Sequence, residues 1–120
     1  MKSPQLFDAE YKFMQLVWAH EPVNSTELVR LSLEHLGWKK STTYTVLRKL
    51  CERGILRNRD AVVTALAKRE AVQRHESSSL IEKSFGGSLP QFLAAFLEER
   101  KLSAQEAAAL RRIIEEARRR

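Results

Sequence analysis

Two helical segments separated by only four residues, 37–40, constrain this chain more than any other feature. On a helical wheel with about 100° per residue, the second segment, residues 41–53, has an apolar face made of Thr43, Val46, Leu47 and Leu50. Its other face is polar and basic, and carries Ser41, Thr42, Thr45, Arg48 and Lys49. This arrangement predicts a helix-turn-helix, in which the second helix presents its polar face to DNA.

Local signals predict where the helices around this motif begin and end. Residues 8–20 repeat apolar side chains at helical spacing and stop before a Glu-Pro pair. Asn24 and Glu27 have the spacing of a capping box at the start of the second helix. Gly37 is placed for a left-handed turn at its end, and we expect Ser41 to cap the third helix.

The segment after the third helix has the pattern of a short β-hairpin. Residues 55–57 and 61–66 predict two strands around a polar turn at residues 58–60, with basic side chains at the tip. Three helices followed by a hairpin is the order of a winged helix. We therefore predict a mostly α (α+β) fold, with a winged-helix DNA-binding domain and its two-stranded wing in residues 1–67.

The remaining residues, 68–120, predict an all-helical second domain. Gly86 and Gly87 interrupt the pattern, Ser88 is a plausible N-cap, and Ser103 with Glu106 forms a second capping box. About 50 residues of short helices bury too little surface to be stable alone. We expect two copies to dimerise through the apolar stripes of these helices: Leu80, Phe85, Leu89, Phe92, Leu93, Phe96, Leu97, Leu110, Ile113 and Ile114. The alternative is that the helices fold back onto the N-terminal domain.

Positive charge is concentrated in the segment that contains the third helix and the hairpin. The chain has a net charge of +6, and residues 38–59 contain seven Lys or Arg side chains but only one acidic one. Such a local excess is typical of a nucleic-acid interface. The predicted DNA contacts are Lys40, Ser41, Thr42, Tyr44, Thr45, Arg48, Lys49, Arg53, Arg57 and Arg59.

Several classes of function lack a sequence signal. The three histidines are scattered along the sequence, and none is paired with a cysteine or an acid at the spacing of a metal site or a catalytic triad. We therefore predict neither an enzyme nor a metal site. Gly86 and Gly87 do not form a phosphate-binding loop, and no cofactor is expected. Cys51 is the one cysteine, which excludes an intrachain disulfide. No apolar run approaches the about 20 residues of a membrane helix, and we expect a cytoplasmic protein.

Four stretches in this order resemble the penicillinase repressor family of the BlaI, MecI and CopY type. Residues 6–18 are similar to its opening helix, with an acid, an aromatic residue, a methionine and Trp18 at the family's spacing. WKKSTTYTVLRKLCERGIL, residues 38–56, is similar to its recognition-helix pattern. Ser79 with residues 85–89 resembles its interdomain segment, and FLEERKLS, residues 96–103, a late helical one.

The resemblance implies a homodimeric repressor on a palindromic operator near a promoter. It places Ser41, Thr42 and Thr45 at DNA-facing positions. Tyr44 and Lys49 replace a Gln and an Arg of the family pattern, which implies a different operator sequence, because Lys cannot make the forked guanine contact of Arg. The wing turn is shorter than the family's, which predicts fewer phosphate contacts.

The resemblance also implies a partner for the resistance regulators of the family, a co-encoded membrane sensor protease that cleaves an Asn-Phe bond in the helical domain. The matching bond is Ala95–Phe96, and the Asn is absent. The Cys-rich tail of the copper-responsive branch is absent too. Two other functions stay open from the residues: an effector-responsive winged-helix regulator with a small-molecule pocket, and a winged-helix module that binds proteins.

Overall fold

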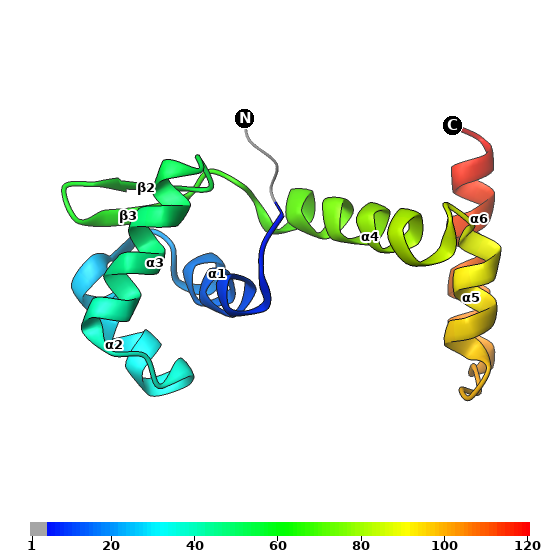
Figure 1. The fold of residues 1–120 in the computed structure, drawn as a ribbon. Coiled ribbons are helices and arrows are strands. Elements are labelled where there is room, and N and C mark those ends of the chain that lie inside the picture. Colours follow the sequence, from blue (N-terminus) through cyan, green and yellow to red (C-terminus); the bar gives the residue numbers. More distant parts are fainter. Residues whose placement is uncertain (1–4) are drawn as a thin grey trace. The chain divides into compact units, whose positions relative to one another are not determined.

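The computed structural model describes residues 5–120, and the chain divides into two compact units, Met1–Ser77 and Ser78–Arg120 (Figure 1). The division falls within the fourth helix, α4 (Arg69–Phe85). The domains expected from the sequence, residues 1–67 and 68–120, stay a prediction about which segments fold independently.

The first unit has the predicted winged-helix order. It runs through α1 (Asp8–His20), β1 (Val23–Asn24), α2 (Ser25–Leu36), α3 (Lys40–Glu52), β2 (Leu56–Arg59), β3 (Val62–Ala65) and the first turns of α4. The strands form an antiparallel sheet in the order β1-β3-β2. The third strand, β1, was not predicted, because two residues are too short to show an alternating pattern.

The core of this unit lies where α1, α2, α3 and the sheet meet. Phe13, Leu28, Leu50 and Ile55 are each at most 1 % exposed. Phe13 also stacks on Trp38 of the turn between α2 and α3, with the ring centroids 5.6 Å apart. Because the apolar face of α3 is buried here, its opposite face has to point to solvent.

The ends of α1 and α2 lie where the local signals place them, but the capping box predicted for Asn24 and Glu27 is only half formed, because the Glu27 carboxylate accepts from Arg30 instead. The Asn24 side chain caps α2 by accepting a hydrogen bond from the Thr26 N–H at 2.9 Å, and Gly37 adopts the predicted left-handed conformation with a φ of 70°. The prediction that Ser41 caps α3 is wrong. The helix begins at Lys40 and its N-cap is Lys39, whose side chain makes no capping hydrogen bond. Ser41 therefore lies inside the first turn and is exposed.

The turn of the wing is tighter than the sequence predicted. Asn58 and Arg59 belong to β2, and the turn consists of Asp60 and Ala61, with φ values of 53° and 66°. Two successive residues with positive φ are typical of the two-residue hairpin turn that matches strand twist. The expected turn at residues 58–60 is wrong because Ala61 is not a turn-forming residue by sequence preference.

Replacing Ala61 by glycine is expected to stabilise the protein by about 0.5–1 kcal/mol, because glycine adopts positive φ without the steric cost that alanine pays. The Ala61 carbonyl accepts a hydrogen bond from the Ser25 N–H at 2.8 Å, and this bond survives the substitution. Chemical denaturation measures the change. Asp60→Gly is the matched control and should gain less, since Asp tolerates this conformation better than Ala. Destabilisation by Ala61→Gly would contradict the strained-turn account.

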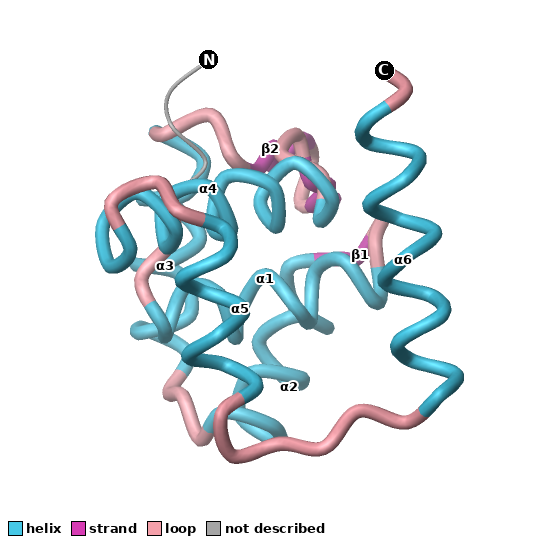
Figure 2. Tube along the Cα trace, turned by 90° about the vertical axis from the view of Figure 1, so that its right-hand side faces the viewer, coloured by secondary structure: helices cyan, strands magenta, loops and turns pink. Residues whose placement is uncertain are grey.

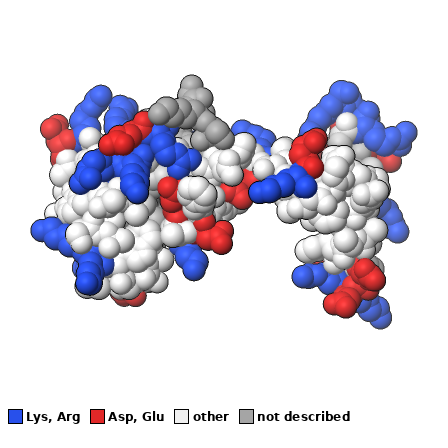
Figure 3. All heavy atoms as spheres, in the orientation of Figure 1, with Lys and Arg blue, Asp and Glu red and all other residues white. Residues whose placement is uncertain are grey.

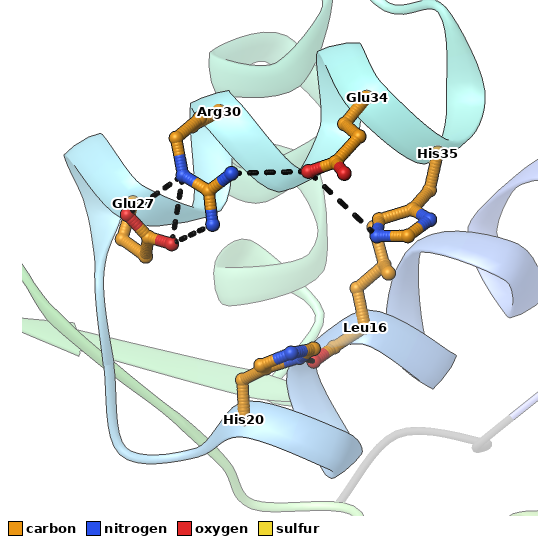
Figure 4. A network of polar contacts seen from close by, with 6 residues as sticks. All are labelled: Leu16, His20, Glu27, Arg30, Glu34 and His35. Atoms are coloured by element: carbon orange, nitrogen blue, oxygen red, sulfur yellow. Dashed lines mark hydrogen bonds and ion pairs between the residues drawn. The ribbon is translucent and has the colours of Figure 1, made fainter.

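The outer face of α2 carries a ladder of charged side chains (Figure 4). Arg30 donates to Glu27 through Nε at 2.9 Å and to Glu34 through Nη1 at 3.0 Å. The hydrogen bond from Arg30 lowers the pKa of the Glu27 carboxyl. The pair of Glu27 and Arg30 therefore contributes to stability above the pKa that the Glu27 carboxyl has in the unfolded chain. This contribution is lost as the pH falls through the lower pKa of the folded protein. Exposed pairs of this kind contribute little, and the core holds α2 in place.

The second unit contains the end of α4, α5 (Leu89–Leu97) and α6 (Ala104–Arg118). Ser88 caps α5 and Ser103 forms the predicted capping box with Glu106. α5 ends at Leu97. α5 and α6 run in opposite directions on either side of their connecting loop (Figure 2). No residue from 78 to 120 is buried. None of the helices in the described part of the chain is long and apolar enough to span a membrane.

Candidate nucleic-acid interface

The face of α3 that the sequence predicted to read DNA is exposed along its whole length. The side chains of Lys40, Ser41, Thr42, Thr45, Arg48 and Lys49 are all exposed. Thr43, Leu47 and Leu50 anchor the other side of the helix in the core. The helical-wheel assignment thus describes which side chains of α3 are accessible to a ligand.

The hydroxyl group of Thr45 is oriented by its own helix. It donates to the Ser41 carbonyl oxygen at 2.9 Å. A threonine hydroxyl has one proton and two lone pairs, so Thr45 retains acceptor capacity and an exposed methyl group. In a major groove these groups suit the amino group of adenine or cytosine and the methyl group of thymine.

The N-terminus of α3 combines two cations with the positive end of the helix. Lys39 and Lys40 are both exposed, and no side chain caps the helix. Backbone N–H groups at a helix N-terminus favour anions such as phosphate. Lys39 was not among the predicted contacts, because Ser41 was expected to occupy the capping position.

A groove of about 340 Å³ lies between α3 and β2 and is lined by Tyr44, Leu47, Arg48, Cys51 and Asn58. Tyr44 is therefore half-buried at the edge of the reading face. Asn58 was missed as a site residue because the sequence placed it in the turn. Alternate residues of a strand share one face, so Asn58 lies on the same face of β2 as the buried Leu56, and this alternation could have identified it. Burial raises the pKa of the Cys51 thiol, so this group is protonated at neutral pH.

The two arginines of the wing lie on the other face of β2 from Asn58. Arg57 pairs across the hairpin with Thr64, and Arg59 with Val62 next to the turn. Arg57 is half-buried and Arg59 is exposed. Figure 3 shows Lys and Arg side chains gathered over the hairpin and the adjoining end of α3. The wing and the recognition helix thus contribute to one positively charged surface.

Arg53 differs from the other predicted contacts because its guanidinium group has partners within the protein. Its Nη1 is 3.0 Å from Glu10 Oε1, and its Nη2 donates to the Gln5 carbonyl oxygen. Glu10 also accepts from the Phe7 N–H at 2.9 Å. The Arg53 and Glu10 side chains are only 28 % and 15 % exposed. Arg53 therefore fastens the end of α3 to the start of α1, and these partners compete with any contact of its guanidinium group to DNA.

Arg53→Met is expected to leave the salt dependence of DNA binding unchanged while it lowers stability by about 1.5–3 kcal/mol, the range for a hydrogen bond to a charged group. The matched variant Arg48→Met should lower the slope of log K against log salt by about 1 for each phosphate that Arg48 neutralises. Titrations of DNA at several salt concentrations measure the slopes. A reduced slope for Arg53→Met would show that Arg53 contacts a DNA phosphate.

The described residues, 5–120, contain no cluster of three or more His, Cys, Asp or Glu side chains that could hold a metal ion. The three histidines lie on α1, α2 and α4. The surface around α3 therefore offers hydroxyl groups, lysines and an arginine, which are the groups that contact bases and phosphates in DNA complexes.

Known proteins with a similar sequence and fold agree with this geometry. The penicillinase repressor family model matches residues 6–116. The penicillinase repressor of Bacillus licheniformis is 29 % identical over 119 residues, which cover 96 % of this chain and 93 % of that protein. The methicillin resistance regulatory protein MecI of Staphylococcus aureus is 22 % identical, over 94 % of this chain and 95 % of its own length.

The solution structure of the DNA-binding domain of the repressor BlaI is similar in fold, with a TM-score of 0.54 and 28 % identity. It matches 59 % of this chain and 93 % of that domain. Two of these relatives are named as repressors and the third as a regulatory protein, which agrees with the expectation that the chain is not an enzyme. The match across almost the whole sequence, on a winged helix with an exposed basic recognition helix, shows that this chain belongs to the penicillinase repressor family of DNA-binding transcriptional repressors.

Proposed function

We propose that this protein represses transcription as a homodimer that binds a palindromic operator through α3 of each copy. The observation that carries the proposal is the surface of the second unit. Leu80, Leu89, Phe96, Ile113 and Ile114 are 46–60 % exposed. Large apolar side chains crowded on helices of this kind mark an interaction surface.

The aromatic side chains of the second unit support a partner of the same kind. Phe85 and Phe92 meet edge to face at 5.5 Å, and Phe92 stacks on Phe96 at 5.7 Å. The row of rings spans the end of α4 and α5. It has no buried layer beneath it within residues 78–120. A second copy, with the same stripes on α5 and α6, supplies apolar surface of matching chemistry and length.

The preference for a palindrome follows from symmetry. Most homodimers have a two-fold axis, so the two copies of α3 meet DNA in opposite orientations and read inverted half-sites. Two linked half-site contacts also raise affinity through a high effective concentration. The basic face of α3, with Lys40, Arg48 and Lys49, favours this function over a protein-binding winged helix.

The test is selection of binding sequences from a random DNA pool, followed by gel shifts of the selected operator in rising salt. The proposal predicts an inverted repeat, and a clear preference over a scrambled sequence of equal length at every salt concentration. Sedimentation of the free protein at micromolar concentration should show a dimer. A monomer in that experiment, or selected sequences without two-fold symmetry, would contradict the proposal.

The sensor protease implied by the resemblance enters the proposal only as a way to release the repressor from its operator, by cleavage of the helical unit. Both residues of the Ala95–Phe96 bond lie within α5 and are exposed. Proteases bind extended substrates, so cleavage at this bond requires α5 to unwind locally. Limited proteolysis of the free protein and of the operator complex tests whether this bond opens.

A further inference from the structure

We propose that Trp18, Glu21, Ala67, Lys68 and Arg69 form a clasp that holds the first turns of α4 on α1, and that this clasp sets the half-site spacing the dimer accepts. We call these five residues the α4 clasp. The inference rests on the proposed homodimer. It assigns to Trp18, which the reading surface does not use, a positioning role in operator selection.

The Trp18 ring is the centre of the α4 clasp. Its indole Nε1 donates to the Ala67 carbonyl oxygen at 3.0 Å. The Arg69 guanidinium carbon lies over the ring, 5.6 Å from its centroid. Tyr11 meets the same ring edge to face at 5.8 Å. One side chain of α1 therefore contacts both the link that leads to α4 and the first residue of α4.

Glu21 provides the second half of the α4 clasp. Its Oε1 accepts from the Ala65 N–H at 2.9 Å and lies 3.6 Å from Lys68 Nζ. The carboxylate thus joins the end of β3 to the residue just before α4. Glu21 is 22 % exposed, whereas Lys68 is 63 % exposed, so the bond to the backbone is the firmer of the two.

These contacts restrict the movement of α4 relative to the sheet, at a short connection that is otherwise held by apolar packing. Only residues 66–68 connect β3 to α4. Val72, one turn into α4, is fully buried in the core of the first unit. Apolar packing resists separation but is not directional, so it tolerates a small swing of α4. The hydrogen bond from Trp18 to the Ala67 carbonyl is directional, and together with the contact between Glu21 and Lys68 it restricts the angle at which α4 begins.

A small swing at this joint matters because α4 is long. Its 17 residues span about 25 Å at about 1.5 Å per residue. A swing of about 10° at its start moves its far end by about 4 Å, slightly more than the about 3.4 Å that one base pair adds along the DNA axis. The stiffness of the α4 clasp therefore decides whether the dimer discriminates operators that differ in spacing by one base pair.

The experiment compares operators whose half-sites are moved apart or together by one and two base pairs, together with a single half-site. The variants are Trp18→Phe combined with Arg69→Met, and separately Glu21→Met. The matched control is Arg74→Met, which removes an exposed cation further along α4. We expect the natural protein and the control to lose about tenfold or more in affinity when the spacing changes. The clasp variants should lose less than about threefold, with unchanged affinity for the half-site.

The outcomes separate this inference from the proposed dimer. Clasp variants that keep the natural dependence on spacing, or a natural protein that tolerates every spacing, would overturn the role of the clasp and leave the dimer in place. A natural protein that binds palindromes no better than half-sites would overturn the proposed function itself. Thermal melting checks folding, and Glu21→Met, which removes the acceptor of the Ala65 N–H without altering the buried core, decides the question if the Trp18 variant unfolds.

Discussion

The double variant Thr45→Ala, Arg48→Ala is expected to bind the operator about a thousandfold more weakly than the natural protein. Both side chains are exposed on α3 and lie one turn apart on its reading face. A dimer presents four such side chains to DNA, and at about 1 kcal/mol each, the lower end of the range for base contacts, the weakening approaches about 4 kcal/mol. Gel shifts or fluorescence anisotropy at fixed salt measure it.

The control for this variant is Lys101→Ala, which removes a cation from the loop between α5 and α6. We expect this variant to bind the operator almost as the natural protein does, because the cation lies outside the reading surface. Thermal melting should be nearly unchanged for both proteins, since neither buries the altered side chains. Operator binding that survives the Thr45 and Arg48 substitutions would show that α3 does not read the sequence.

The variant Ile113→Asp is expected to be a monomer at micromolar concentration and to bind a palindrome no more tightly than a half-site. Ile113 is 60 % exposed on α6, so the charge costs the isolated chain little. In the dimer the same charge is buried without a partner, which costs about 3–5 kcal/mol at each of two symmetric positions. Sedimentation and half-site titrations measure the two effects.

Ala108→Asp is the matched control, because it introduces the same charge on the same helix. At about 100° per residue, Ala108 lies on the opposite side of α6 from Leu110 and Ile113. This variant should remain a dimer with the operator affinity of the natural protein. If the Ile113→Asp protein is still a dimer, Ile113 of α6 is not part of the dimer interface.

The reading face of α3 was predictable from the sequence because its evidence is local. The 3.6-residue period of Thr43, Leu47 and Leu50 fixes which side is buried, and the structure buries those three side chains. The cap at Asn24 and the capping box at Ser103 were predictable for the same reason, since each involves groups within three residues of one another. The start of α3 at Lys40 was not, because Ser41 has the stronger capping preference and the turn geometry overrides it.

The order of the helices and the hairpin, the basic character of one segment and the amphipathic stripes of the helical unit follow from the sequence alone. These features depend on residue periodicity and composition, which act over one or two turns of the chain. Which basic side chains remain accessible depends on the tertiary structure. Arg48 and Arg53 look alike in the sequence, but Arg53 is bound to Glu10, 43 residues away, and Arg48 is exposed. Contacts between distant residues follow from the packing of whole elements, and no local pattern encodes them.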